Sequence, residues 1–298
     1  MNKLWYTEYL MRRTTNDFDK KHIFKIYRYQ LLPVDRFVQG NLFDNYQSIE
    51  DIINKKNIIF NEILVKTPIK DTGNILIEKR LIESENFIIS RYAVKRHITI
   101  ETENFTETEL NTWPSFLLCF WNAPDKQYML IEENKKAYQD CKTIVNAIKG
   151  TFYKKLHDSH LNIHIEPLFE EKFFWDIIHK FDGQITSMKF EMVTPNMANI
   201  SHMLDEDLKV AAKALNSQTT NLEFNSDSNA YLKIDDKNKM VQSLVSYASQ
   251  GGGNITVKAK GIKRKIKTTK TVKTITFDEF ELTTDISNLP HLIRGLLS

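Results

Sequence analysis

A dense run of cations near the C-terminal end of the chain is the feature with the clearest chemistry. From Ile255 to Thr276 the sequence contains eight Lys or Arg residues and no Asp or Glu. Such a row can neutralise phosphates, and the counterions released give affinity that does not depend on base sequence. We call it the basic segment. Its predicted nucleic-acid-binding residues are Lys258, Lys260, Lys263, Arg264, Lys265, Lys267, Lys270 and Lys273.

The pattern around these cations predicts a projecting β-hairpin. In the strand expected at 254–260, apolar side chains alternate with threonine and lysine, which places the lysines on one face. Gly261 begins the turn, and a second strand at 271–282 returns. No aromatic residue precedes Phe277 in the segment to stack on bases. The favoured interpretation is contact with the backbone of a duplex, with DNA preferred over RNA.

Two other interpretations of the basic segment stay open. Lysines on an exposed edge strand protect it from aggregation. Alternatively, the cations pair with an acidic partner chain or with acidic groups of the same chain. The formal net charge of the whole chain is only +3, so the remainder of the chain is net negative.

A second candidate site lies at Pro124–Asp125 and Glu133–Lys135. The pattern superficially resembles that of metal-dependent nucleases of the PD-(D/E)xK type, and Glu132 is a further acid there. The resemblance implies two carboxylates on one Mg²⁺ and a lysine near the attacked phosphate. However, the extended chain between Asp125 and Glu133 spans about 26 Å, too far for shared ligands. We therefore predict no catalytic residues and no metal site, and keep a nuclease as an alternative.

A third candidate combines His157, His160, His164 and Glu166. Three histidines and a carboxylate can bind zinc, but this spacing matches no standard zinc motif, so a solvated polar face is the favoured interpretation. The sequence contains neither a G-x-S-x-G nucleophile motif nor a phosphate-binding loop of the G-x-x-x-x-G-K type. No cofactor is predicted.

The order of expected elements predicts an α+β fold with mostly antiparallel sheets. We divide the chain into a strand-rich N-terminal domain at 1–110 and an α+β domain at 111–298 that ends in the basic hairpin. Strands are expected at 22–32, 58–66, 74–83, 86–92, 94–102, 161–168, 184–193, 220–224 and 230–234, with a hairpin at 115–133. Helices are expected at 48–57, 135–156, 170–181, 205–215, 237–249 and 289–297.

Composition places the chain in a cellular setting. The longest apolar run, Phe116–Trp121, is far shorter than a membrane span, and the polar N-terminus predicts no signal peptide. We expect a cytoplasmic protein in which Cys119 and Cys141 are buried. The abundance of Lys, Asn and Ile suggests an AT-rich bacterial genome.

Taken together, the sequence predicts a non-enzymatic nucleic-acid-binding accessory subunit. It would work with a protein partner or as a homo-oligomer, in bacterial anti-phage defence. The alternatives are the metal-dependent nuclease and an assembly protein that binds an acidic protein partner.

Overall fold

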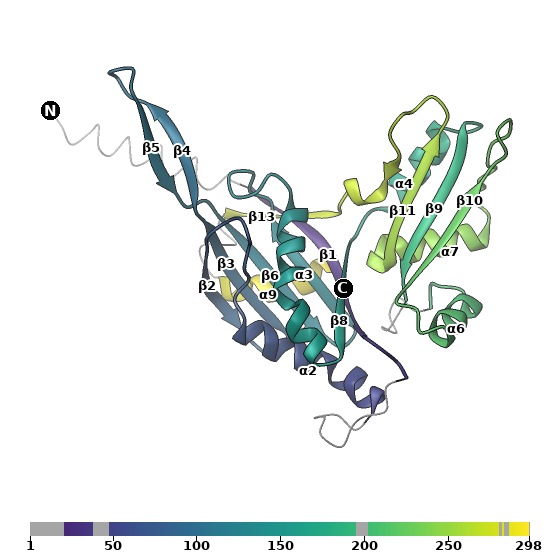
Figure 1. The fold of residues 1–298 in the computed structure, drawn as a ribbon, viewed down its shortest axis with the longest axis horizontal. Coiled ribbons are helices and arrows are strands. Elements are labelled where there is room, and N and C mark those ends of the chain that lie inside the picture. The colour runs from purple at the N-terminus through teal and green to yellow at the C-terminus, as the bar shows by residue number, and fades with distance from the viewer. Residues whose placement is uncertain (1–20, 38–47, 195–201, 280–281, 283–285, 298) are drawn as a thin grey trace.

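The fold consists of a large and a small lobe, which are joined at one side and diverge from there (Figure 1). The computed structural model describes residues 21–37, 48–194, 202–279, 282 and 286–297. The large lobe is built on a seven-stranded sheet and the small lobe, residues 168–272, on a four-stranded sheet. A separate two-stranded hairpin, β4 (Arg96–Glu101) and β5 (Glu107–Thr112), projects from the large lobe. Among the described residues, no helix combines the length and the apolar composition that crossing a bilayer requires.

The sheet of the large lobe is organised around β1 (Lys21–Pro33). Its strand order is β13-β1-β7-β6-β3-β2, and β8 also pairs with β1. The other strands of this sheet are β2 (Leu76–Glu83), β3 (Phe87–Val94), β6 (Ser115–Ala123), β7 (Lys126–Glu132), β8 (Leu161–Pro167) and β13 (Thr274–Asp278). Every pairing in it is antiparallel.

Helices cover both faces of this sheet. On one face lie α2 (Ile49–Lys66) and α3 (Cys141–Asp158), whose apolar stripes pack with Tyr29 and Phe120 in one core. On the other face α9 (Leu289–Leu297) buries Leu289 and Ile293 against Phe24 and Ile26 of β1. Each of the first two helices begins at a side-chain cap, Ser48 for α2 and Asp140 for α3. The large lobe is thus a three-layer structure.

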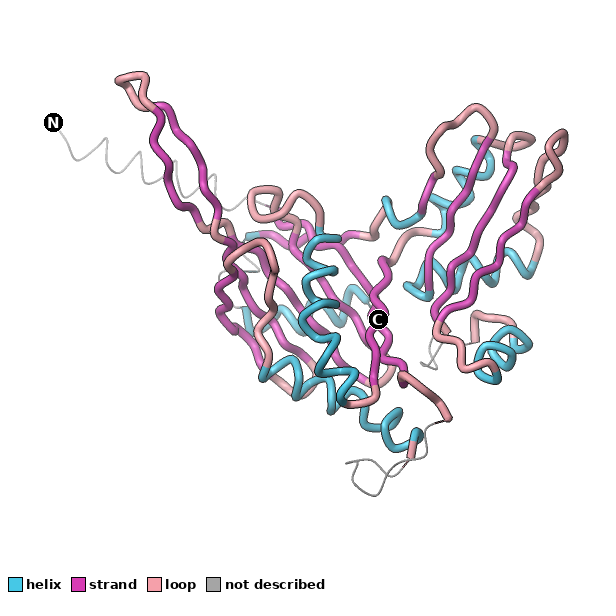
Figure 2. Tube along the Cα trace, in the orientation of Figure 1, coloured by secondary structure: helices cyan, strands magenta, loops and turns pink. Residues whose placement is uncertain are grey.

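The small lobe has helices behind one face of its sheet only (Figure 2). Its strand order is β10-β9-β11-β12. The strands are β9 (Ile185–Val193), β10 (Thr219–Asn225), β11 (Gly253–Ala259) and β12 (Ile266–Lys267), and the helices are α4 (Glu171–Lys180), α6 (Glu206–Ala214), α7 (Lys239–Tyr247), η1 (Ala248–Gly252) and η2 (Thr268–Lys270). Phe174 of α4 and Leu244 of α7 pack with Phe190 and Ile255 of the sheet. Cross-strand sets such as Thr256, Lys189 and Glu223 therefore occupy the open face.

The α+β class with mostly antiparallel sheets is confirmed. Two predicted strands are wrong. Residues 58–66 continue α2, because Ile59, Phe60 and Ile63 bury one helical stripe. Residues 230–234 form no strand, although the Leu232 amide donates to the Ile185 carbonyl. The strand β5, polar in sequence, was not predicted and exists through its pairing with β4.

The second strand of the predicted basic hairpin is also misplaced. β11 pairs with the short β12, through Thr256↔Lys267 and Val257↔Ile266. The residues that follow return to the large lobe as β13 and pair with β1. They do so because Phe277 is buried there, edge-on to Phe24 at a ring-centroid distance of 5.4 Å. Residues 280 and 281 of that predicted strand lie outside the described residues.

The division predicted between residues 110 and 111 does not follow the sheets. The seven-stranded sheet takes β1 to β3 from one side of that position and β6, β7, β8 and β13 from the other. The small lobe is instead an insertion between β8 and β13. Both of these strands pair with the same edge of β1, β8 through residues 27–33 and β13 through residues 21–25.

Three consecutive glycines form the joint between the lobes. Gly251 has a φ of +80°, and a Cβ there would lie 2.5 Å from the Arg28 Cβ. At Gly253 a Cβ would overlap the backbone of Glu191 in β9. The guanidinium of buried Arg28 donates to the Gln250 carbonyl at 2.6 Å and to the Tyr128 hydroxyl at 2.6 Å. Only glycine allows η1 to approach β1 this closely.

We expect Gly251→Ala to destabilise the protein by about 1–3 kcal/mol, because the added methyl overpacks against Arg28 at a left-handed backbone position. The matched control is Gly150→Ala in the interior of α3, where a Cβ meets nothing within 4 Å. The free energy of unfolding of this control should rise by up to about 1 kcal/mol, because alanine favours the helix more than glycine does. Urea unfolding measures both changes, and equal stabilities of the two variants would contradict the packing argument.

Candidate functional site

The basic segment starts on a regular strand and continues into a turn that is hydrogen bonded back to that strand. In β11, Ile255, Val257 and Ala259 are buried while Lys258 and Lys260 are exposed, as the alternation predicts. Gly261, with a φ of +79°, opens the turn.

Beyond the turn, Thr268 fixes the chain after β12. Its hydroxyl accepts from the Ile255 amide at 3.0 Å and is itself buried. This pin holds Lys267, Thr269 and Lys270 beside the start of β11.

All eight predicted cations are exposed. Within the described part of the chain, none of them forms an ion pair with a carboxylate. Lys260 does have a side-chain partner, because its ammonium lies 3.2 Å from the Tyr231 hydroxyl and 5.6 Å from the centroid of that ring. The segment is therefore a concentrated positive surface that the described carboxylates do not neutralise.

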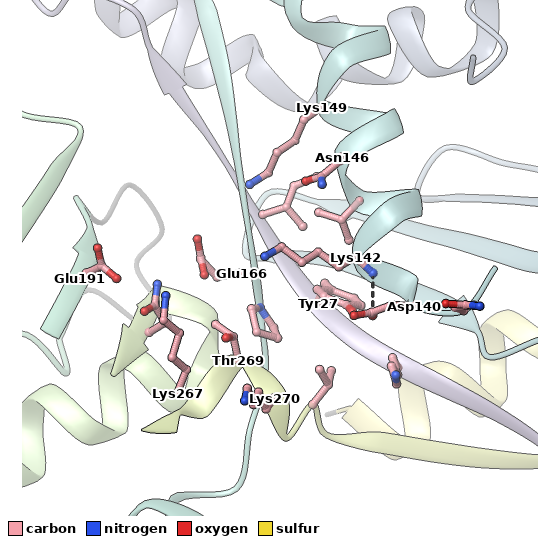
Figure 3. Close-up of a pocket in the computed structure, with 17 residues that line it drawn as sticks. Tyr27, Asp140, Lys142, Asn146, Lys149, Glu166, Glu191, Lys267, Thr269 and Lys270 are labelled. Carbon is pink, nitrogen blue, oxygen red and sulfur yellow. Dashed lines mark hydrogen bonds between the residues drawn. The ribbon is translucent and has the colours of Figure 1, made fainter. Parts of the chain in front are cut away.

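The part of the basic segment after its turn, which we call the stem, forms one wall of a cleft between the lobes (Figure 3). The stem residues that line the cleft are Lys267, Thr269, Lys270 and Val272. The opposite wall is α3, which presents Lys142, Val145, Asn146 and Lys149 at helical spacings of three and four. Between the walls lies a floor of Tyr27 from β1 with Ile165, Glu166 and Pro167 from β8, and the cavity volume is about 440 Å³. Residues more than a hundred positions apart in the sequence thus meet at one site.

The cleft holds an excess of positive charge. Five lysines and three carboxylates line it. Lys25 is paired with Glu133 at 3.4 Å, and Glu191 is paired with Lys189 at 2.8 Å. The Asp140 side chain caps α3 by accepting from the Lys142 amide. The ammonium groups of Lys142, Lys149, Lys267 and Lys270 have no carboxylate partner among the residues described.

Glu166 is the carboxylate between the two walls (Figure 3). Burial raises the pKa of its carboxyl above the usual value, and the nearby charge of Lys149 and a hydrogen bond with Asn254 lower it by less. Burial also lowers the pKa of neighbouring His164, whose Nε2 lies 3.0 Å from the Gln218 Oε1. Glu166 is the polar group of the floor that is placed to accept hydrogen bonds from a ligand.

The acids of the nuclease-like pattern are not brought together. Asp125 lies in the turn before β7 and Glu133 follows its other end, so about 26 Å of extended chain separates them. The carboxylate of Glu132 accepts from the Leu117 amide at 2.7 Å and contacts His22 Nδ1 at 2.5 Å. These contacts give Glu132 a structural role in which it ties β7 to β6 and β1.

The three histidines also point to different surroundings. His157 is in the last turn of α3, with its ring 5.7 Å from that of Tyr153. His160 adopts a φ of +56° in the turn that follows, and His164 is on β8. Within the described ranges, no group of three or more His, Cys, Asp or Glu side chains is arranged to hold a metal ion.

Sequence reasoning missed Lys142 and Lys149. Their spacing of seven residues on the polar side of α3 was the available signal, since it places both on one helical stripe. It could not indicate that the basic segment lies opposite this stripe.

Comparison with family models, curated proteins and solved structures gives no match.

We expect Glu166→Gln to remove a pH-dependent loss of stability. Because the folded-state pKa of Glu166 is raised, the folded chain binds more protons than the unfolded chain at pH values above 4.5, the usual value of the group. Stability due to this group therefore falls as the pH rises through that window. The free energy of unfolding of the variant, minus that of the parent, should rise from about pH 4 and level off above the raised pKa.

Urea titrations across this pH range measure the difference. The control is Glu103→Gln, which changes an exposed carboxylate in the loop after β4. The free energy of unfolding of this control, minus that of the parent, should show no such rise with pH. A difference for Glu166→Gln that falls with pH would show that its charged form stabilises the fold.

Proposed function

We propose that the chain binds duplex nucleic acid, DNA rather than RNA, through phosphate contacts of the basic segment. The observation that carries the proposal is that eight exposed cations follow one continuous stretch from β11 through its turn, β12 and η2 to Lys273. None of them forms an ion pair with a carboxylate among the described residues. Each lysine or arginine that meets a phosphate releases counterions, so eight contacts correspond to a log–log salt slope of about −7 on duplex DNA. We further propose that the protein is a cytoplasmic accessory subunit in bacterial anti-phage defence.

The position of the cations favours this interpretation over edge protection. β11 lies between β9 and β12, and Thr256 and Val257 pair with β12, so β11 is not an edge strand at these residues. Lys263, Arg264 and Lys265 lie in the turn region, where there is no sheet edge to protect. Of the eight, Lys267 is on the edge strand β12. Protection of an exposed edge strand from aggregation therefore explains few of these residues.

The two other functions have less support. A nuclease requires carboxylates that share a metal, and Asp125 and Glu133 lie at opposite ends of β7. An acidic protein partner would use the same exposed cations as nucleic acid. The regular repetition of lysine and threonine, without apolar anchors on the exposed side, fits a phosphate backbone better than a protein interface.

The decisive variant reverses the charges at the tip of the segment, Lys263→Glu, Arg264→Glu and Lys265→Glu. We expect duplex affinity to fall at least about a hundredfold and the magnitude of the salt slope to drop by about 3. The fold should be unaffected because all three side chains are exposed. Fluorescence anisotropy with a labelled duplex at several salt concentrations measures affinity and slope together.

A matched control applies the same charge change elsewhere. Lys66, Lys70 and Lys79 are exposed on the large lobe, and their reversal to glutamate changes the net charge equally. The control should keep most of the affinity. If the control weakens binding as much as the tip variant, the attraction is a general effect of net charge and the proposed surface is wrong.

We also propose that the β4–β5 hairpin joins two copies of the chain. Ile98 and Leu110 are cross-strand partners on one face and are 43% and 44% exposed, with Ile100 beside them. The other face pairs Glu101 with Glu107. An isolated two-stranded ribbon is marginally stable in water. Packing of the apolar faces about a two-fold axis is self-complementary and leaves the glutamates in solvent.

Ile98→Glu should convert this dimer to a monomer, because it places a charge in the apolar contact. Thr99→Glu introduces the same residue on the opposite face and should leave the dimer intact. Sedimentation velocity at several protein concentrations measures the mass of each variant. A parent protein that stays monomeric throughout would exclude a second copy as the occupant of this face.

A further inference from the structure

We infer that the cleft between the lobes is a binding site for a nucleotide, distinct from the duplex-binding tip of the basic segment. The site is formed by α3 on one wall, by β12 and η2 on the other, and by β8 and β1 on the floor. This inference does not depend on the proposed duplex binding, although Lys267 and Lys270 belong to both surfaces.

The phosphate end of the ligand is specified by the lysines. Lys142 and Lys149 approach from α3, and Lys267 and Lys270 approach from the opposite wall (Figure 3). None of the four ammonium groups forms an ion pair with a described carboxylate, although the charge of Glu166 acts on Lys149 and Lys142. The cleft therefore keeps an excess of positive charge, which an anion placed between the lysines would offset. Several phosphoryl groups in a row satisfy donors on two walls better than one small anion does.

The nucleoside end is specified by the floor. Tyr27, Ile165, Pro167 and Val272 line this end of the cleft. The first three are largely buried and Val272 is half-buried, so the apolar surface that they leave for a base is small. Beside them, the Glu166 carboxylate can accept hydrogen bonds from ribose hydroxyls or from a base amino group. The Glu166 carboxylate and this small apolar surface favour a nucleotide over inorganic triphosphate, which can use neither.

The size of the cleft excludes a duplex. A volume of about 440 Å³ is in the range of small-molecule sites. The duplex would therefore contact the tip at 263–265 outside the cleft.

The cleft is also held open by fixed contacts. Besides the joint at Arg28, Gln218 of the small lobe hydrogen bonds to the Asn162 side chain at 2.9 Å and donates to the Pro33 carbonyl at 3.1 Å. These contacts connect the small lobe to β1 and β8 at a second place. The walls are thus positioned before any ligand binds.

Isothermal titration calorimetry on the full chain tests the inference, with ATP and GTP as probes and with inorganic triphosphate and ribose 5-phosphate as truncated ligands. We expect one saturable site for a nucleotide, and at least about tenfold weaker binding of both truncated ligands. Lys142→Met and Lys149→Met should each weaken nucleotide binding about tenfold or more. Lys154→Met, exposed on the same helix and outside the cleft lining, should have no effect.

The tip variant at Lys263, Arg264 and Lys265 separates the two sites. It should lose duplex binding and keep nucleotide binding, so failure of either proposal is recognised without the other. The inference is overturned if neither nucleotide binds, if triphosphate binds as tightly as ATP, or if the α3 variants bind like the parent. Unfolding curves of the variants exclude loss of fold as the cause of weaker binding.

Discussion

The two lobes depend on one edge of β1, which is shared end to end by two strands. β8 occupies its C-terminal half and β13 its N-terminal half, and the change from one to the other takes place at Ile26. The Ile26 carbonyl accepts from the Leu168 amide at 3.0 Å, and the Ile26 amide donates to the Lys273 carbonyl at 3.0 Å. The chain leaves the large lobe and returns to it across a single residue.

This constraint brings the ends of the insertion together. The Lys273 amide donates to the Leu168 carbonyl, which closes the small lobe at its base with 2.6 Å between the two atoms. The basic segment is the last part of the insertion before the return, so its stem must lie near β8 and its tip can project. Strand pairing alone therefore brings Lys267 and Lys270 to the cleft that Glu166 also lines.

Local elements could be predicted from the sequence where pattern and caps agree. The stripe of Ile144, Ile148 and Phe152 predicted α3, and the alternation of Ile255 and Val257 predicted β11. Pairing partners could not be predicted, because an alternating strand such as Thr274–Asp278 has no local preference for β11 over β1. Its partner is decided by the burial of Phe277 against Phe24, a contact between residues far apart in the sequence.

The same limit applies to the candidate site. The eight cations of the basic segment are recognisable as a run, since density of one charge is a local property. Lys142 and Lys149 are ordinary exposed positions on an amphipathic helix until the fold places α3 opposite the segment. A site assembled from separate elements has no signal in any one of them, and the long-range pairing that creates it is the part of the fold that sequence patterns leave open.

The two proposed sites share cations, and this sharing makes their ligands antagonistic. A nucleotide held by Lys267 and Lys270 neutralises two of the eight cations of the basic segment. Two fewer phosphate contacts correspond to a reduction of about 1.8 in the magnitude of the duplex salt slope. Linkage requires that a bound duplex weaken nucleotide binding by the same factor. No conformational change is needed for this coupling, because it arises where one segment contributes its tip to an exposed surface and its stem to a cleft.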